Sequence, residues 1–355
     1  MKRLLLLTTT PLEQDPRARR AAATAAAIGV EAIHIHEGRS GRATVLTAAA
    51  RHFGVVGREL RGVARVARLL RTTARLALHA RSLHFDVLHA NDLDTLPAGW
   101  WLARRRGARL VYDAHELYSG FESEPPRVWA RISLLTERAL ARRADAVVTV
   151  SQPIADELER RLRLAHPPLL VLNCPPQQEV VVEPRNSAPR VRAVYQAAVG
   201  PGRHIQDVVD AARDAPAVEV TVRLLGGDLS ELPGIRVEPP VEPDELVSAL
   251  APYDIGLVID RPETDNARLA LPNKLFEYLM AGLAVAVPEA PAMARLVETH
   301  GIGIVYEPGQ LGAALALLGS DRGTLDETRR RARALAVSSF NAEAQRPNLL
   351  RAWGL

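Results

Sequence analysis

Residues 271–288 read Leu-Pro-Asn-Lys-Leu-Phe-Glu-Tyr-Leu-Met-Ala-Gly-Leu-Ala-Val-Ala-Val-Pro, and this stretch predicts a helix that leads directly into a strand. Pro272 suits the first helical position, where a missing N–H has no cost. Gly282 suits the position just past the end of the helix. The apolar run 284–287 has the length of a buried strand. A helix followed by a buried strand is the repeating unit of an α/β protein with a parallel sheet.

The same alternation of short apolar runs and longer helical patterns covers the whole chain. In the first half we expect strands at 4–8, 32–36, 87–89, 110–112, 146–150 and 169–172. In the second half we expect strands at 191–195, 219–225, 235–237, 255–259, 284–287 and 303–305. Two such sets predict two doubly wound parallel-sheet domains, whose ligands bind beyond the carboxyl ends of the strands. We therefore expect a site in the cleft where both sets of strand ends face each other.

The length of 355 residues suits two domains of about 150–180 residues each. Proline and polar residues concentrate at 175–189, a composition that is typical of a linker. We expect an N-terminal domain over 1–175, a C-terminal domain over 176–336, and a final helix over 337–355 that packs back on the N-terminal domain.

Composition excludes several classes of protein. Cys174 is the only cysteine, which excludes an intrachain disulfide and a cysteine-based metal cluster and fits a reducing cytoplasm. Every apolar run is shorter than the ~18 residues that a membrane helix needs, including the one before Pro11. The net charge of +4 favours anionic partners.

The helix expected after residue 271 carries the residue types that bind a nucleoside diphosphate. The amides of residues 272–275 and the helix dipole are expected to form an anion site, to which Lys274 adds a positive charge. Glu277 lies one turn from Asn273 and can accept hydrogen bonds from a ribose diol. The alternative is an ordinary amphipathic helix whose Asn and Glu face solvent. The candidate nucleotide-binding residues here are Pro272, Asn273, Lys274, Leu275 and Glu277.

Polar residues after the strand at 87–89 are candidates for binding an acceptor. Asn91, Asp92 and Asp94 would lie at the carboxyl edge of the first sheet, where their side chains can bind hydroxyl groups. The alternative is an Asp-rich loop that caps a helix starting at Asp94, with Pro97 in its first turn.

The first helix is expected to begin with Asp15 as its N-cap and Pro16 at its first position, and to run to Gly29. Its N-terminus would face the cleft, and Asp15, Arg17 and Arg19 are candidates for binding an acceptor. Plain helix capping is the alternative.

Two further candidates follow strands of the second half. Arg203 can donate two parallel hydrogen bonds to a phosphate, although a surface arginine is the alternative in so Arg-rich a chain. Gly226 follows the strand at 219–225 and would let a nucleotide approach the backbone closely.

The segment from Arg51 to Arg81 is strongly basic, with Glu59 as its one acidic residue. One helix face holds positions 58, 61, 65, 68 and 75, and an apolar face holds Val56, Leu60, Val63, Ala67, Leu70 and Ala74. Such a helix is typical of contact with an anionic membrane, so we expect a cytoplasmic protein that is peripheral at the inner face of the cell membrane. The alternative is a surface helix that uses arginine for solubility. Scarce aromatic residues argue against a nucleic-acid partner.

The stretch 271–282 resembles the nucleotide-binding signature of retaining GT-B glycosyltransferases of family four, in the bacterial branch that has Leu-Pro-Asn-Lys-Leu-Phe-Glu-Tyr. Further matches follow in the expected order at 15–20, 89–94, 112–118, 148–154, 194–203 and 254–257. The resemblance implies the GT-B architecture, with two Rossmann-like domains facing across a cleft. It implies transfer of a sugar from a nucleotide diphosphate sugar to a hydroxyl acceptor, with retention and without a metal or other cofactor. The basic segment favours an acceptor that is lipid-linked or a growing polysaccharide.

The resemblance also implies residue roles. His115, in the run 112–118, would lie at the reaction centre, where we expect a neutral imidazole that hydrogen-bonds a sugar hydroxyl. Arg203 and Lys274 would stabilise the leaving diphosphate. The expected catalytic residues are His115, Glu277, Arg203 and Lys274.

Three positions depart from the family pattern. Leu269 replaces a Glu, Gln196 begins a Gln-Ala-Ala run in place of a Gly-Arg pair, and His204 replaces a Gly. Two alternatives therefore stay open: a nucleotide-sugar epimerase, which needs no acceptor, and a non-catalytic member that acts as a partner or scaffold in membrane-associated glycan synthesis.

Overall fold

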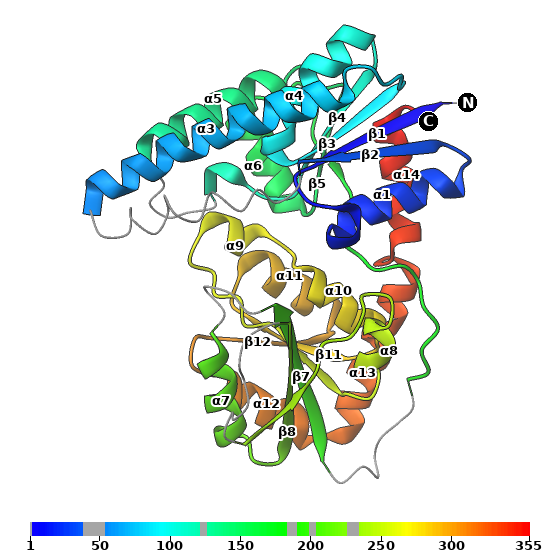
Figure 1. The fold of residues 1–355 in the computed structure, drawn as a ribbon. Coiled ribbons are helices and arrows are strands. Elements are labelled where there is room, and N and C mark those ends of the chain that lie inside the picture. Colours follow the sequence, from blue (N-terminus) through cyan, green and yellow to red (C-terminus); the bar gives the residue numbers. More distant parts are fainter. Residues whose placement is uncertain (1, 38–53, 121–125, 183–189, 199–203, 226–233) are drawn as a thin grey trace. The chain divides into compact units, whose positions relative to one another are not determined.

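The computed structural model describes residues 2–37, 54–120, 126–182, 190–198, 204–225 and 234–355, and contains two parallel β-sheets of six strands each (Figure 1). Contacts divide the chain into two compact units. The first comprises Met1–Val171, Thr264–Asn266 and Arg346–Leu355, and the second comprises Leu172–Glu263 and Ala267–Gln345. The domain limits expected from the sequence, 175/176 and 336/337, stay predictions.

The first sheet has the strand order β2-β1-β3-β4-β5-β6, and its strands pair in parallel. Every strand expected in the first half is present. The bounds are β1 (Arg3–Thr8), β2 (Glu31–His36), β3 (Val87–Asn91), β4 (Arg109–Ala114), β5 (Ala146–Thr149) and β6 (Leu169–Leu170). The inner strands are buried on both faces, which is why they read as continuous apolar runs.

Helices cover both faces of this sheet. One face packs against α1 and the end of α14, with Ala21, Leu349 and Trp353 in its core. The other face packs against α4, which contacts α3 and α5 in one layer (Figure 1). The helix bounds are η1 (Leu12–Gln14), α1 (Pro16–Ala27), α3 (Gly54–Ala80), α4 (Asp92–Arg106), η3 (Tyr118–Gly120), α5 (Arg127–Ala141), α6 (Gln152–Leu162) and α14 (Ala342–Trp353).

The turn from β3 into α4 is tighter than the sequence suggested. The helix begins at Asp92, with Asn91 as its N-cap, so the expected start at Asp94 is wrong by two residues. The strand continues through Asn91 and the chain enters the helix without a loop. Asp92 absorbs this sharp change of direction with φ 66°, in the left-handed region that residues other than glycine rarely adopt.

The second sheet has the order β12-β11-β10-β7-β8-β9 and is also parallel. Its strands are β7 (Val191–Ala198), β8 (Val218–Leu225), β9 (Ile235–Glu238), β10 (Ile255–Leu257), β11 (Ala284–Pro288) and β12 (Gly303–Tyr306). The helices are α7 (Ile205–Asp214), α8 (Leu246–Leu250), α9 (Asp265–Leu269), α10 (Asn273–Met280), α11 (Pro291–His300), α12 (Leu311–Ser320) and α13 (Arg322–Ser338). Cores on both faces of the sheet make it doubly wound.

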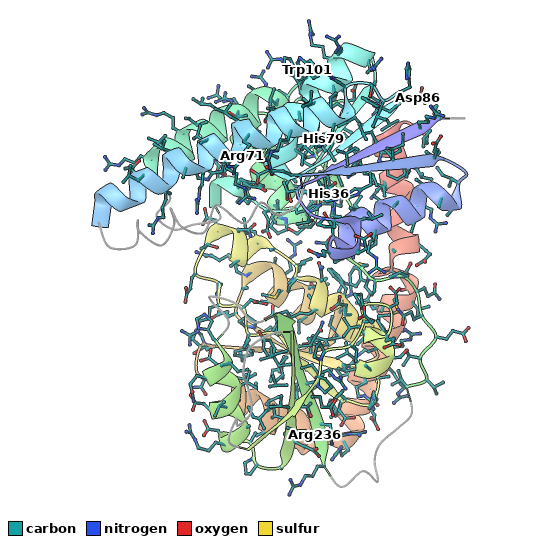
Figure 2. The ribbon with its side chains drawn as sticks, in the orientation of Figure 1. His36, Arg71, His79, Asp86, Trp101 and Arg236 are labelled. Carbon is teal, nitrogen blue, oxygen red and sulfur yellow. The ribbon has the colours of Figure 1, made fainter. Side chains whose placement is uncertain are left out.

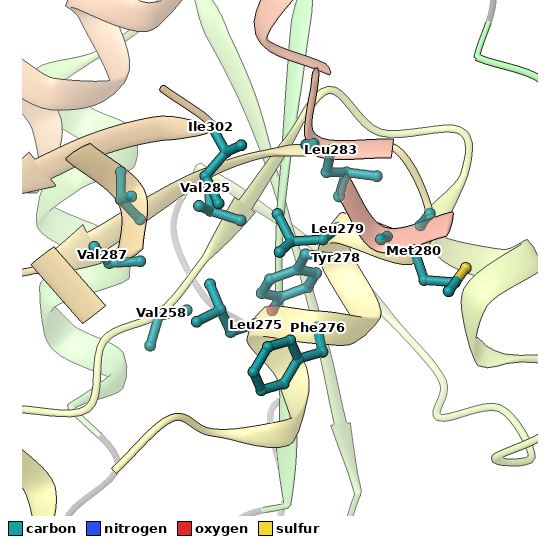
Figure 3. Close-up of a cluster of buried hydrophobic side chains, with 14 of the residues drawn as sticks. Val258, Leu275, Phe276, Tyr278, Leu279, Met280, Leu283, Val285, Val287 and Ile302 are labelled. Carbon is teal, nitrogen blue, oxygen red and sulfur yellow. The ribbon is translucent and has the colours of Figure 1, made fainter. Parts of the chain in front are cut away.

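Helix α10 lies over β10 and β11 and is held by a close approach to the sheet. Its apolar face places Leu275, Phe276 and Leu279 in the core with Val285 (Figure 3). The Tyr278 ring lies directly on Gly256, where any added methyl group would overlap it. The helix starts at Asn273, so Pro272 is its N-cap and not its first residue. Gly282 follows the helix with φ 76°, as its predicted position requires.

The contact between Gly256 and Tyr278 yields a stability prediction. We expect Gly256→Ala to lower the free energy of unfolding by about 1–3 kcal/mol, because the methyl group displaces a ring that is buried on all sides. Urea unfolding followed by circular dichroism measures the change. Gly323→Ala, at an exposed position in the first turn of α13, is the matched control and should change stability by less than about 1 kcal/mol. Equal effects of the two substitutions would contradict the steric argument.

Candidate functional site

The carboxyl ends of β3 and β4 bring three polar side chains to one face of the first sheet. Asn91 pairs in register with Asp113, and His89 lies two residues before Asn91. Residues two apart in a strand point to the same face, so His89, Asn91 and Asp113 share the face that α1 and α14 cover. From the sequence, Asn91 was expected at this edge of the sheet.

Asp113 is buried and binds the guanidinium group of Arg17 through both oxygens. Arg17 Nε lies 2.7 Å from Asp113 Oδ2, and Nη2 lies 2.6 Å from Oδ1. Arg17 Nη1 donates to the carbonyl of Val171 at 2.7 Å. His89 Nε2 lies 2.9 Å from Asp113 Oδ2. Burial raises the pKa of Asp113, but the charges of Arg17 and His115 outweigh it and hold the pKa well below its ordinary value.

His115 lies between two carboxylates. Its Nδ1 is 3.4 Å from Asp92 Oδ2, and its Nε2 is 3.6 Å from Asp113 Oδ2. Burial lowers the pKa of the imidazole, but Asp92 and Asp113 outweigh burial and raise the pKa to about 9. Both ring nitrogens face carboxylates, which favour the charged imidazolium over the neutral imidazole that the sequence led us to expect.

The strained turn at Asp92 serves this arrangement. Its Oδ1 accepts a hydrogen bond from the backbone N–H of His115 at 3.3 Å, while its Oδ2 faces the imidazole ring. Non-glycine residues with positive φ concentrate at functional sites, where the surrounding structure holds them in place. Asp92 thus combines a left-handed backbone with a carboxylate that raises the pKa of His115.

Two groups beside this centre have unused hydrogen-bonding capacity. Both side-chain atoms of Asn91 lack a hydrogen-bond partner among the described residues, although Asn91 is only 3% exposed. His115 Nε2 has only the long 3.6 Å contact with Asp113. A buried unpaired polar group costs about 1–3 kcal/mol, so it usually marks a place where a ligand or water binds. A cationic donor next to an amide can bind a hydroxyl group or an anionic oxygen.

Other acceptor candidates have partners within the first unit. Asp15 caps α1 by accepting from the amides of Arg17 and Ala18, and Arg19 is half-buried on the same helix. Asp94 lies 3.4 Å from Arg68 Nη2, and its pKa is raised because burial outweighs the attraction of that arginine. Their roles in binding an acceptor stay predictions.

Asn266 also belongs to this centre, and the sequence gave no sign of it. Its Oδ1 accepts from the amide of Leu117 at 2.7 Å, and its Nδ2 donates to Glu116. These bonds fix the backbone directly after His115. Asn266 lies 149 positions from Leu117 in the chain, and no local pattern connects them.

In the second unit, the N-terminus of α10 offers fewer amides than expected. Pro272 has no N–H, and the N–H of Leu275 donates to the carbonyl of Pro272 at 3.1 Å. The expected set of four donors at 272–275 is therefore wrong. The amides of Asn273 and Lys274 precede that bond, at the first two positions of the helix.

Lys274 is buried and already paired. Its Nζ donates to Asp260 Oδ2 at 2.9 Å and lies 5.1 Å from the centre of the Tyr195 ring. The lysine is placed at the start of α10 as predicted, but Asp260 compensates the full positive charge expected there. An incoming anion must share or replace that carboxylate.

Glu277 is held by Gln196, a residue that the sequence marked only as a departure from the family pattern. Gln196 Nε2 donates to Glu277 Oε2 at 2.6 Å. The backbone N–H of Gln196 donates to Tyr278 Oη at 3.0 Å, and Tyr278 Oη donates to the carbonyl of Leu257 at 3.1 Å. This chain of bonds orients the carboxylate at the ends of β7 and β10.

The remaining candidates cannot be placed. Arg203 and Gly226 lie outside the described residues, so their roles stay predictions, as does the common crevice expected from the sequence.

Among the residues that the structure describes, no group of three His, Cys, Asp or Glu side chains is arranged to hold a metal ion.

A buried pair of Tyr112 and Glu137 lies on the opposite side of β4. Tyr112 Oη donates to Glu137 Oε1 at 2.7 Å, and both side chains are inaccessible to solvent. Burial raises the pKa of Glu137 to about 7, although the hydrogen bond from Tyr112 partly opposes it.

Part of the chain resembles known glycosyltransferases in sequence. Residues 48–175 match the model of Glycosyltransferase Family 4. A relative from Bacillus subtilis (strain 168), described as uncharacterized glycosyltransferase YqgM, is 33% identical over 110 residues. This match covers 30% of the chain and 28% of the relative, so the chain spans less than a third of that relative's length.

Two solved structures share the fold. Sucrose-phosphate synthase from Thermosynechococcus elongatus matches with a TM-score of 0.74 at 13% identity, over 100% of this chain and 98% of that chain. Anabaena Alr3699/HepE in complex with UDP matches with a TM-score of 0.71 at 15% identity, over 100% of both chains. These likenesses confirm the predicted GT-B fold class of two parallel-sheet α/β halves.

The buried Glu137 yields a prediction about pH. Its folded pKa of about 7 lies above the ordinary value of 4.5, so the unfolded chain releases this proton first as the pH rises. The free energy of unfolding should therefore fall between pH 4.5 and 7, by up to about 3 kcal/mol from this group. Glu137→Gln should remove most of that slope. Urea unfolding at pH 5 and pH 7.5 measures it, and an unchanged slope in the variant would contradict the assignment.

Proposed function

We propose that the protein is a glycosyltransferase that moves a sugar from a nucleotide diphosphate sugar to a hydroxyl acceptor, with retention and without a metal ion. The observation that carries the proposal is the pair of unsatisfied groups at the edge of the first sheet. His115 offers a charged N–H, and Asn91, in register with Asp113 on the neighbouring strand, offers both a donor and an acceptor. These are the groups that bind the hydroxyls of a sugar.

The second unit supports the nucleotide part of the proposal. Glu277 accepts hydrogen bonds from the ribose diol, and Gln196 holds it in place for that contact. The first amides of α10 and the helix dipole bind the diphosphate, with Arg203 as a further donor. Gly226 gives the nucleotide room to approach. The neighbour HepE was solved with UDP, which supports a nucleoside diphosphate as the leaving group.

Catalysis in this proposal is electrostatic. Negative charge develops on the leaving diphosphate in the transition state, and Arg203, Lys274 and the α10 amides stabilise it. Lys274 shifts from Asp260 toward the phosphate as that charge grows. His115 donates from Nε2 to an oxygen of the transferred sugar and stays charged while doing so. Asn91, Asp92 and Asp94, with the N-terminus of α1 at Asp15, Arg17 and Arg19, form the acceptor side.

The proposal includes contact with an anionic membrane through α3, and a lipid-linked or growing polysaccharide acceptor. The exposure of apolar side chains on α3 supports this part of the proposal. The apolar stripe of α3 faces solvent: Leu60 is 56% and Leu70 is 65% exposed, and Val63 and Leu78 are similarly open. The packed face of the helix instead holds Leu69, Thr72 and Leu76.

Arginines flank the exposed stripe. Arg71 and Arg75 lie 3.9 and 3.7 Å from a carboxylate oxygen of Glu37. Nearly half of each arginine side chain is exposed to solvent (Figure 2 shows Arg71). An exposed leucine stripe with arginines beside it fits the apolar interior and anionic headgroups of one bilayer leaflet. In the described part of the chain no helix is long and apolar enough to cross a membrane.

Donor binding tests the central proposal. We expect one member of a panel of UDP-, GDP-, ADP- and dTDP-sugars to bind by calorimetry, and Glu277→Gln to raise its Kd about 10- to 100-fold, since a carboxylate accepts stronger hydrogen bonds from a diol than an amide does. Glu298→Gln, at an exposed position on α11, is the matched control and should leave Kd unchanged.

Product analysis separates the alternatives. Transfer to an acceptor supports the proposal, isomerisation of the donor without an acceptor indicates an epimerase, and binding without turnover indicates a non-catalytic partner. The site assignment fails if no sugar nucleotide binds or if Glu277→Gln leaves the affinity unchanged.

Membrane contact has its own test. We expect the double variant Leu60→Ser, Leu70→Ser to bind anionic phosphatidylserine vesicles at least about tenfold less well, because each leucine contributes about 1 kcal/mol or more when buried. Leu317→Ser in α12 alters an equally exposed leucine (66%) of the second unit and should have no effect. Sedimentation with vesicles measures binding. Equal binding by all three proteins would contradict the contact through α3.

A further inference from the structure

Trp353, two residues from the end of the chain, reaches the polar centre of the first unit. Its indole N–H donates to Nδ1 of His89 at 3.1 Å, and the two rings meet edge to face with centroids 6.1 Å apart. Trp353 is 1% exposed and His89 is fully buried. The contact joins the last helix of the chain to the third strand.

The end of α14 is firmly anchored, so the indole has little freedom. Leu349, Ala352 and Trp353 pack in the core cluster under the first sheet. Arg109 Nε donates to the carbonyl of Ala352 at 2.7 Å, and Asn348 Nδ2 donates to the carbonyl of Leu170 at 2.9 Å. Each of these bonds ties α14 to a strand of the sheet.

The contact fixes where the proton of His89 lies. An indole nitrogen can only donate, so Nδ1 of His89 must present its lone pair. A neutral imidazole then carries its proton on Nε2, which donates to Asp113 Oδ2 at 2.9 Å. A second proton on Nδ1 would point at the indole N–H and break this hydrogen bond. Trp353 therefore holds His89 neutral and in a single tautomer.

The charge of His89 matters because Asp113 also serves His115. The groups that face His115 are Asp92 from α4, Asp113 from β4 and Arg17 from α1, with Glu116 next in the chain. The groups that face His89 are Asp113 and Trp353. A cationic His89 would add a positive charge 2.9 Å from Asp113 and compete with His115 for the same carboxylate.

We propose that Trp353 is a positioning residue for the reaction centre: by keeping His89 neutral, it leaves the charge of Asp113 available to hold His115 as an imidazolium. The role of His115 in transfer rests on the proposed function, whereas the effect of Trp353 on the two histidines does not. The tryptophan touches no reacting atom and acts only through His89 and Asp113.

The test is Trp353→Phe, which keeps an aromatic ring and removes the N–H. We expect the Nδ1 signal of His89 to lose the shift of a ring nitrogen that accepts a hydrogen bond, and the pKa of His115 to fall by about one unit from about 9. Ring ¹⁵N shifts followed by NMR titration report both histidines without any need for turnover. Where transfer is measured, the basic limb of the kcat profile should shift to lower pH by the same amount.

Two further variants make the result decisive. Trp101→Phe applies the same substitution to a half-exposed tryptophan of α4 (Figure 2) and should shift neither histidine. His89→Gln is always neutral, can accept from Trp353 and can donate to Asp113, so Trp353→Phe should have no effect on His115 in that background. A persisting shift there would show that the tryptophan acts through packing and would overturn the proposal.

Activity and NMR together separate the two claims. Unchanged histidine titrations in Trp353→Phe overturn the positioning role even in an active enzyme. Shifted titrations in a protein that transfers no sugar support the positioning role and contradict the proposed function.

Discussion

The buried ion pair of Arg17 and Asp113 is the constraint on which the polar centre of the first unit depends. Two charges taken out of water are tolerated only when geometry is good and the remaining hydrogen-bonding capacity is filled. Here Arg17 donates from two nitrogens of its guanidinium to Asp113 and from the third to the carbonyl of Val171, and Asp113 accepts from His89 as well. The pair thereby ties the start of α1, the end of β4 and the chain after β6 together.

Much of the fold was predictable because local sequence patterns indicate its strands and helices. Parallel strands buried on both faces read as short apolar runs, and every predicted strand occurs in the structure. Errors arose at element ends. Pro272 was placed inside its helix and Asp94 at the start of another, because capping signals fix a helix boundary only to within one or two residues. The direct passage from β3 into α4 depends on a left-handed Asp92, which composition does not reveal.

The site was predictable only in part. Residues that follow strands, such as Asn91, Asp92 and His115, could be named as candidates because strand ends mark the ligand edge of a parallel sheet. The contacts that build the centre were missed because they join residues that are remote in sequence. Arg17 lies 96 positions from Asp113, and Trp353 lies 264 positions from His89. The charge state of His115 was also mispredicted, because it depends on two carboxylates that approach the ring only after folding.

The ion pair of Lys274 with Asp260 has a consequence for selectivity. A phosphate that reaches this lysine exchanges one anion for another, so the net gain is the difference between two attractions and not the whole of one. Small inorganic anions, which bring charge but no further contacts, gain little from such an exchange. In the proposed site, a ligand that also engages Glu277 would gain more, so Asp260 would disfavour the binding of polyanions that lack this second contact.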